Sequence, residues 1–515
     1  MFQQELSGFD QRYLQQNDWP VHDFNQWESR HFSPLSAEAK LDSLKSFTAK
    51  STALILWRKM HLLLLGGDDV DLNKFKALFS ALPFLQQNML YNQLMRSKFV
   101  GQSVAMDYAP LYRIMIENFC NESSKYSHVS PLIGNGNEQI VVLLTNQFLI
   151  NQHGPTLTIL NYASALKAMG KHPVVICCTS VPKRSHYLYP MPLPFYFSNV
   201  LDEYFTGDRL FDLDTEKNHA HSNGNVVKCW GELFDFMQIT PMDDQEHLVN
   251  LVNVINQLNP RFIIGVGGLN PVLEFIAQSR PVLNVPCVTS LVTPIYAVPV
   301  LHRELTEQDL QRVKFLNLVH PVITSRLPFR LRQFSCKKSS KVTDPVINFA
   351  VVGYRLELEI RNDFVETLLA IKATLPNSAF VFIGPEAIDQ LPPEIQACSY
   401  FSGKIKNAID LIAGCHFMLN PKRQGGGTSA IEALSLGVPV LTEAYGDVYQ
   451  YIGDDFVFSS DNERLAFIQR YLTDAKFEAS YNQNCLDTAA RATDSSATVR
   501  TLLLDYDSYI YQLQN

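Results

Sequence analysis

Three consecutive glycines between two apolar runs constrain the local fold of this chain more than any other feature. The residues from His416 to Leu419 read as a short buried strand, and Gly425, Gly426 and Gly427 follow after a polar turn. Glycines let a backbone approach a ligand closely because no Cβ stands in the way. Val438 to Leu441 reads as the next buried strand. The stretch therefore predicts a strand, a glycine loop, a helix and a second strand.

The helix of this unit is expected to begin at Thr428 or Ser429, either of which can cap it, and to end at Gly437. Unpaired N–H groups and the helix dipole make such a helix start a site for phosphate. Glu432 lies one turn beyond Thr428 on the same face, where its carboxylate can accept two hydrogen bonds from a ribose diol. An ordinary α/β crossover with a glycine-rich turn is the alternative to this nucleotide site.

The same stretch resembles the donor-nucleotide site of GT-B glycosyltransferases, in particular the retaining enzymes grouped around glycosyltransferase family 4. Glu432 matches the second of the two glutamates in their signature, and Gly437 to Val440 matches the Gly-x-Pro-Val strand that follows. Gln424 stands where the first glutamate, which holds donor-sugar hydroxyls, is found. Because glutamine carries no charge, the resemblance leaves retention or inversion of the anomeric configuration open. It implies a nucleotide-sugar donor, expected to be UDP-linked, bound by Gln424, Gly425, Gly426, Gly427, Thr428, Ser429 and Glu432.

The resemblance also implies positive charge beside the donor diphosphate. Arg355 follows the predicted strand 347–353, at the position of the family's Gly-Arg-Leu turn with one residue inserted. The lysine that the family carries a few residues later is absent, because 358–360 reads Leu-Glu-Ile. The candidates to replace it are Lys404, Lys422 and Arg423. Since such cations neutralise a departing nucleoside diphosphate, neither a metal ion nor another cofactor is expected.

A first doubly wound domain is expected upstream, where strand 139–144, helix 155–169 and strand 173–176 form a β-α-β unit. His153 lies on the loop after its first strand, facing the cleft where such sheets bind ligands. The ordinary pKa of histidine suits a general base that takes a proton from an acceptor hydroxyl. Inverting glycosyltransferases of the same fold have a similar His-Gly pair, which makes His153 the candidate catalytic residue. The alternative is a histidine that caps or packs on the helix.

The composition bounds the function classes. The chain has 515 residues, 46% of them hydrophobic and 18% charged, which indicates a globular protein of two or three domains. Its formal net charge is −8 without a long basic run, so nucleic acid is not an expected partner. Nine scattered cysteines without a Cys-x-x-Cys pair are typical of reduced thiols in a cytoplasmic protein. Residues 54–65 are too short and too charged to span a bilayer, while peripheral membrane contact stays open.

These patterns predict an α/β fold of the GT-B type, with two facing Rossmann-like domains and an N-terminal all-α domain. The expected domains are 1–130 (helical), 137–335 (Rossmann-like, for the acceptor), 345–495 (Rossmann-like, for the nucleotide-sugar) and 496–515 (a helix crossing back to the first Rossmann-like domain). The helical domain has two open roles, acceptor recognition and contact with another subunit or partner protein.

The predicted function is a cytoplasmic, metal-independent, hexosyltransferase-like glycosyltransferase of the Leloir type, acting on a protein or glycan acceptor. A rival is a catalytically silent GT-B subunit that binds or chaperones proteins in glycosylation or glycoprotein export, which Gln424 and the missing lysine favour. A dinucleotide-dependent oxidoreductase is disfavoured, because Gly-x-Gly-x-x-Gly does not follow the first strand of either α/β domain.

Overall fold

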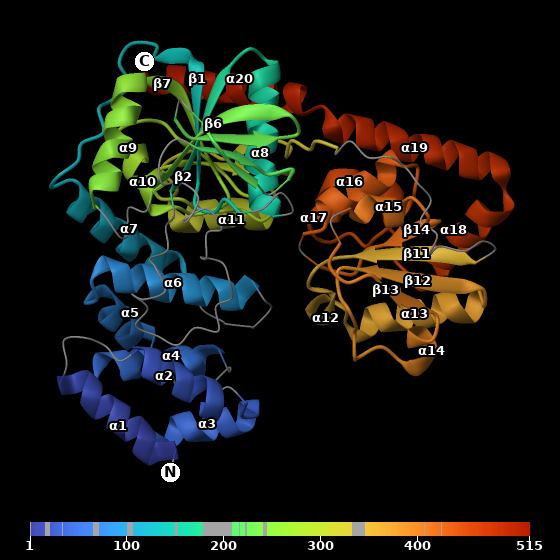
Figure 1. Ribbon diagram of the computed structural model, residues 1–515, viewed down its shortest axis with the longest axis horizontal. Coiled ribbons are helices and arrows are strands. Elements are labelled where there is room, and N and C mark those ends of the chain that lie inside the picture. The colour runs from blue at the N-terminus through green and yellow to red at the C-terminus, as the bar shows by residue number, and fades with distance from the viewer. Residues whose placement is uncertain are drawn as a thin grey trace.

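The computed structural model describes residues 2–15, 21–32, 34–64, 72–99, 107–149, 153–178, 209–215, 217–221, 224–239, 245–331, 346–405, 407–423 and 425–514. The chain passes through a stack of helices, then through two α/β units that lie beside each other, and ends on two long helices (Figure 1).

The N-terminal helices pack around a core of aromatic rings. They are α1 (Phe2–Gln15), α2 (Val21–Trp27), a π-helical turn (Glu28–Phe32), α3 (Ala37–Ser46), α4 (Thr52–Leu64), α5 (Leu72–Ser80), α6 (Phe84–Phe99) and α7 (Ala109–Ser123). Trp57 is fully buried between Phe24 and Phe32, and its indole N–H donates to Glu28 Oε1 at 3.0 Å. None of the described helices is both long enough and apolar enough to cross a membrane.

The first α/β unit, built from β1–β10 and α8–α11, contains a mostly parallel sheet. Its strands are β1 (Asn137–Thr145), β2 (His172–Cys178), β3 (Arg209–Asp212), β4 (Lys217–Ala220), β5 (Val226–Cys229), β6 (Glu232–Ile239), β7 (Pro260–Val266), β8 (Leu283–Val285), β9 (Val298–Leu301) and β10 (Ile323–Thr324). In the described residues they form one ten-stranded sheet in the order β10-β9-β8-β7-β1-β2-β6-β5-β3-β4. From β10 to β6 every pair is parallel, whereas β5 and β4 run antiparallel to β6 and β3.

The helices of the first unit are α8 (Gly154–Ala168), α9 (Gln245–Leu258), α10 (Pro271–Ala277) and α11 (Glu307–Leu316). Helix α10 also contacts α7, where the Tyr112 hydroxyl donates to the fully buried Glu274 at 3.0 Å. The same carboxylate accepts backbone N–H groups of Ile295, Tyr296 and Ala297. Burial of Glu274 raises its pKa, and the hydrogen bonds that it accepts oppose this rise. This contact joins the helical stack to the first α/β unit.

The second α/β unit, built from β11–β15 and α12–α18, is wholly parallel. Its strands are β11 (Ile347–Val352), β12 (Ser378–Ile383), β13 (Ser399–Phe401), β14 (Phe417–Leu419) and β15 (Val440–Leu441), in the order β13-β12-β11-β14-β15. Its helices are α12 (Leu356–Glu359), α13 (Asn362–Thr374), α14 (Pro393–Gln396), α15 (Ala408–Ile412), α16 (Gly427–Ser435), α17 (Gly446–Ile452) and α18 (Asp461–Thr473). The apolar strands β11, β12 and β14 are almost entirely buried, as strands covered on both faces must be.

The last two helices connect the two units. Helix α19 (Ala475–Thr493) packs along α16, and α20 (Ser495–Gln514) packs against α8 of the first unit (Figure 1). There the Tyr506 ring contacts Phe262, with ring centroids 5.9 Å apart, and Asp507 forms an ion pair with Arg261. The two parallel-rich sheets and the N-terminal helices confirm the predicted fold class.

Candidate functional site

The glycine loop, residues 425–427, lies at the point where the strand order of the second sheet reverses. Strands β11 and β14 are neighbours there, and the loops that leave their carboxyl ends contain Arg355 and the glycine loop. Open parallel sheets bind ligands in the crevice outside such strand ends. The guanidinium Nη2 of Arg355 lies 3.7 Å from the position that a Cβ on Gly425 would take. The structure thus brings Arg355 to the glycine loop.

Two glycines in the left-handed region turn the chain into helix α16. Gly425 has φ of 91°, and Gly426, the N-cap, has φ of 87°. The prediction that Thr428 or Ser429 caps this helix is wrong, because Gly426 is the cap and no side chain hydrogen-bonds there. The two glycines complete the turn before Thr428, so both hydroxyl residues fall within the first turn. These φ values disfavour any side chain at the two turn positions.

The first turn of α16 presents unpaired backbone donors. Among the described residues, none accepts a hydrogen bond from the N–H of Gly427, Thr428 or Ser429. Such N–H groups at a helix start point outward along the axis and, with the helix dipole, attract anions. The N–H of Gly425 is different, because it donates to Asp447 Oδ2 at 3.1 Å.

Gly427 is pressed against aromatic rings from both α/β units. A Cβ at this position would stand 2.5 Å from the Tyr451 ring and 3.5 Å from Phe329 of the first unit. The two rings meet edge to face, with centroids 4.8 Å apart. The glycine loop is therefore packed between the two units, so that α16 starts beside the first unit.

The guanidinium of Arg423 lies against Gly426 of the glycine loop, and its hydrogen bonds go to other residues of the protein. Its guanidinium pairs with Glu359 at 2.7 Å, donates to the Val352 carbonyl oxygen, and donates to Asn420 Oδ1 at 3.1 Å. Only 5% of its side chain is exposed. A buried arginine with all these partners is not available to a diphosphate, so Arg423 is removed from the candidates that could replace the missing lysine.

The remaining cations lie at the rim of this region. Arg355 pairs with Glu359 at 2.9 Å and keeps 37% of its side chain exposed. Lys422 lies 3.7 Å from Glu443 and is half exposed. Lys404 is exposed on the loop after β13, next to Ile405. Of these three cations, Arg355 is the one that the described residues place against the glycine loop, and the roles of all three stay predictions.

Of the two polar residues predicted to bind the donor, Gln424 for the sugar and Glu432 for the ribose, the structure describes only Glu432. Gln424 lies outside the described residues. Glu432 lies one turn inside α16 and is 4% exposed. A carboxylate at this depth needs polar partners, from the protein or from a ligand. Its ribose role stays a prediction.

His153 caps helix α8 by position, directly after the loop that follows β1. Its Nδ1 lies 2.9 Å from Thr156 Oγ1, which also accepts the N–H of Leu149 at 2.8 Å. With the proton on Nδ1, the ring donates to Thr156 and keeps a lone pair on Nε2. Burial lowers the pKa of His153 to about 4, so the ring is neutral at neutral pH. Its catalytic role stays a prediction.

Asp447 joins the two α/β units at the edge of the glycine loop. Its Oδ1 accepts the N–H of Thr289 at 2.9 Å and the Thr289 hydroxyl at 2.7 Å, while its Oδ2 accepts the N–H of Gly425. Only 2% of Asp447 is exposed. The contact between Asp447 and Thr289 joins positions 158 residues apart, so the sequence carries no local signal of it.

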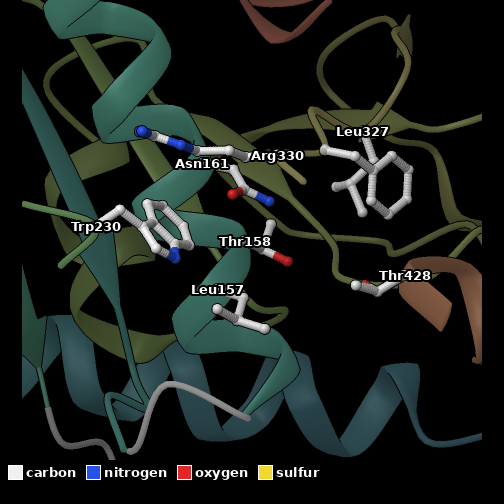
Figure 2. A pocket seen from close by; sticks show the side chains of 8 residues that line it. Leu157, Thr158, Asn161, Trp230, Leu327, Arg330 and Thr428 are labelled. Atoms are coloured by element: carbon white, nitrogen blue, oxygen red, sulfur yellow. The ribbon is translucent and has the colours of Figure 1, made fainter. Parts of the chain in front are cut away.

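A narrow cavity lies where α8 meets α16. Leu157, Thr158 and Asn161 of α8 line one side, and Trp230, Arg330 and Thr428 line the others (Figure 2). Leu157 lies one turn beyond His153, whose carbonyl oxygen accepts its N–H. The carboxyl edges of the two sheets therefore meet here, with His153 on one side and the start of α16 on the other. Among the described residues, no group of three or more His, Cys, Asp or Glu could hold a metal ion.

Comparisons with known proteins found similar structures but no similar sequence. No protein-family model and no curated protein sequence matches the chain. An O-GlcNAc transferase from Thermobaculum terrenum is similar over 98% of this chain and 98% of its own, at 11% identity and a TM-score of 0.49. A glycosyltransferase from Rickettsia africae is similar over 72% of this chain and 99% of its own, at 10% identity and a TM-score of 0.48.

The pneumococcal O-GlcNAc transferase GtfA is similar over 72% of this chain and 99% of its own, with 12% identity and a TM-score of 0.44. At such identities a shared activity does not follow from the similarity. This chain itself has two parallel-rich sheets whose strand order reverses once in each, between β7 and β1 in the first unit and between β11 and β14 in the second. That arrangement gives this chain the GT-B-like fold that its sequence predicts.

Proposed function

We propose that this chain is a metal-independent glycosyltransferase that moves a sugar from a nucleotide-sugar, expected to be UDP-linked, to a protein or glycan acceptor. One observation carries the proposal. The N–H groups at the start of α16, which have no acceptor in the described part of the chain, lie at the switch point of the second sheet, beside the guanidinium of Arg355. Helix-start N–H groups and an arginine together form a site that suits a diphosphate.

The proposed chemistry divides the work between the two α/β units. The start of α16 and Arg355 hold the diphosphate and stabilise the charge that develops as it leaves. His153, across the junction, would accept the proton of the acceptor hydroxyl on Nε2, with Thr156 fixing the ring through Nδ1. Burial keeps this histidine neutral, which is the form that a base requires. Helix N–H groups and an arginine here serve where other enzymes use a cation.

The organisation of the whole chain remains part of the same proposal. We take 1–130, 137–335 and 345–495 as its domains and 496–515 as the helix that crosses back. The cytoplasm is the proposed location. The N-terminal helices are proposed to bind the acceptor or another subunit.

A second candidate function is a catalytically silent GT-B subunit that binds partner proteins. Two observations favour it. The N–H of Gly425 is already taken by Asp447, and Arg423 is committed to Glu359. Gln424 also lacks the charge of the glutamate found at that position in family 4.

A thermal-shift panel of UDP, GDP, ADP and their sugar conjugates tests the proposal. A ligand present at 100 times its dissociation constant stabilises the folded state by about 2.7 kcal/mol. One nucleotide and its sugar conjugate should raise the melting temperature, and the conjugate should then be consumed when acceptor is added. Turnover with any acceptor rules out the silent subunit. Binding without turnover supports the silent subunit, and the absence of any shift contradicts the proposed transferase.

A further inference from the structure

An open pocket lies between helices α3 and α4 of the N-terminal stack. It is lined by Phe47, Thr48 and Ala49 of the segment that joins the two helices, and by Ile55 and Arg58 of α4. The volume of the pocket is about 250 Å³, whereas a cavity of about 150 Å³ is enough for a benzene ring. The pocket therefore has room for an apolar side chain.

This pocket is remote from the glycine loop. Figure 1 shows α3 and α4 at the far end of the helical stack, with α5, α6 and α7 between them and the first α/β unit. A ligand bound between α3 and α4 does not reach the start of α16. The pocket is therefore separate from the diphosphate site and from the junction of the two α/β units.

One wall of the pocket contains a cation without an anionic partner in the described chain. The Nε of Arg58 donates to the carbonyl oxygen of Leu44, in the last turn of α3, at 2.6 Å. Its two Nη groups donate no hydrogen bond to any residue that the structure describes, and Arg58 forms no ion pair with those residues. A guanidinium with both Nη groups available matches the two oxygens of a carboxylate.

The segment between α3 and α4 adds backbone donors to the same pocket. The carboxylate of Asp10 fixes this segment, because it accepts the N–H groups of Lys50 and Ser51, both at 2.8 Å. The N–H groups of Thr48 and Ala49 have no acceptor among the described residues. Both residues line the pocket, so their N–H groups are close to the space that a ligand would fill.

The sequence around the pocket is basic, although the whole chain has a formal net charge of −8. Residues 43–67 include Lys45, Lys50, Arg58 and Lys59 and contain no Asp or Glu. Such a local excess of positive charge attracts an anion. Phe47, which is 3% exposed, gives the pocket an apolar floor. The ligand that fits this combination has a carboxylate and an apolar group.

We propose that this pocket binds the C-terminal residue of a partner polypeptide, with the carboxylate on Arg58 and the apolar side chain against Phe47. Because one small pocket contains the cation, the backbone donors and the apolar floor, both groups of the ligand must belong to one residue. A chain terminus meets this condition, and capture of a C-terminal carboxylate by backbone N–H groups is a recurrent mode of peptide recognition. The inference rests on the proposed role of the N-terminal helices in binding another protein, and not on sugar transfer.

Fluorescence anisotropy with labelled hexapeptides tests the pocket in the full chain. The probes end in Leu, Ile, Val or Phe with a free carboxylate, and the control probes either carry a C-terminal amide or end in Gly. At least one apolar probe with a free carboxylate should bind. Its amide and the Gly probe should bind at least about tenfold more weakly, because each lacks one of the two groups that the pocket contacts.

Two variants locate the binding. Arg58→Gln removes the guanidinium, and Thr48→Trp fills the pocket from an exposed position. Each should weaken binding of the probe at least about tenfold. Lys45→Gln is the matched control, because it removes the same charge from an exposed neighbour that does not line the pocket, and it should bind the probe like the unaltered protein. If Arg58→Gln melts lower, because its bond to Leu44 is lost, Thr48→Trp decides the question.

Equal binding of the free acid and its amide would overturn the proposal, as would equal binding of the probe to Thr48→Trp and the unaltered protein. So would a failure of every probe to bind, or N-acetyl-leucine binding more tightly than any peptide, which would indicate a site for a small acid. UDP affinity should be the same in all variants. Peptide binding by a protein that binds no nucleotide would reject the proposed transferase and retain the pocket, so the two failures are distinguishable.

Discussion

The carboxylate of Asp447 accepts both the backbone N–H and the hydroxyl of Thr289, at 2.9 and 2.7 Å, across the junction of the two α/β units. Its other oxygen accepts the N–H of Gly425. One buried anion therefore fixes the glycine loop of the second unit against the first. Hydrogen bonds to a charged group are about twice as strong as neutral ones, which makes this a rigid link.

Thr289→Val should loosen that link without changing the volume of the side chain. The loss of one hydrogen bond to a buried carboxylate is expected to cost about 1 to 3 kcal/mol of unfolding free energy. UDP affinity should fall as well, because Gly425 is held through the same carboxylate. Denaturant unfolding and UDP titration measure both effects, with Thr324→Val on exposed β10 as control. An unchanged midpoint would show that the link is not important for stability.

Arg355 and Arg423 both pair with Glu359. Substitution of Arg423 should mainly lower folding stability, whereas substitution of Arg355 should mainly weaken UDP binding. Arg423→Ala breaks a buried ion pair and should cost about 3 to 5 kcal/mol of stability. Arg355→Ala removes a partly exposed pair worth less than about 1 kcal/mol, yet should abolish the stabilisation by UDP. Unfolding curves with and without UDP separate the two. If Arg355→Ala still responds fully to UDP, the diphosphate site is misassigned.

Gly427→Ala should be destabilising because its Cβ would stand 2.5 Å from the Tyr451 ring. The ring is held between Gly427 and Phe329, so we expect a cost of about 1 to 3 kcal/mol from overpacking. Gly8→Ala in α1 is the matched control, because nothing lies within 4 Å of its added Cβ. That control should instead gain up to about 1 kcal/mol from helix propensity. Equal melting temperatures for the two variants would contradict the packing argument.

Glu432→Gln should remove discrimination between UDP and its 2′,3′-dideoxy analogue. The unaltered protein is expected to bind UDP more tightly, because the carboxylate would accept two hydrogen bonds from the ribose diol. Calorimetric titration of both nucleotides into both proteins measures this. A preference for UDP that survives the substitution would mean that Glu432 serves only the packing of α16.

The sequence predicted the elements whose signals are local. Apolar runs indicated β1, β2, β11 and β14 because each is a buried strand in a parallel sheet. The three glycines indicated the loop before α16. They did not indicate that Gly426 is the N-cap of this helix, because its positive φ depends on how the chain enters the helix.

Contacts between distant segments left no such signal. The pairing of Asp447 with Thr289 and the use of Arg423 under the loop depend on how the chain folds back on itself. The strands β3, β4 and β5 were missed because each has four residues and lies in a segment without a clear period. Strand β6 was missed although it is longer and its buried residues Phe234 and Phe236 alternate with exposed ones. Trp230 and Gly231 form the two-residue turn that joins the antiparallel strands β5 and β6. A Trp-Gly pair was the available sequence hint of this hairpin, since two residues ending in glycine often join the strands of a hairpin.

His153 should make the protein less stable in mild acid. Its pKa is about 4 when folded and 6.5 in a model peptide, because burial disfavours the charged ring. Well above pH 6.5 the histidine is neutral in both the folded and the unfolded state. Between pH 6.5 and 4 the unfolded chain binds a proton that the folded chain does not, so stability falls as the pH falls. The full difference corresponds to roughly 3 kcal/mol, which His153→Gln should remove.

Unfolding free energies at pH 7.5 and pH 5 for both proteins test this, and parallel losses in the two would contradict the burial of His153. Activity supplies an independent measurement. If neutral His153 is the base, kcat/KM should not decline near pH 6.5 but only towards pH 4. His153→Gln should abolish transfer while UDP still binds. Transfer at the original rate in this variant would reduce His153 to a residue that packs on α8 through Thr156.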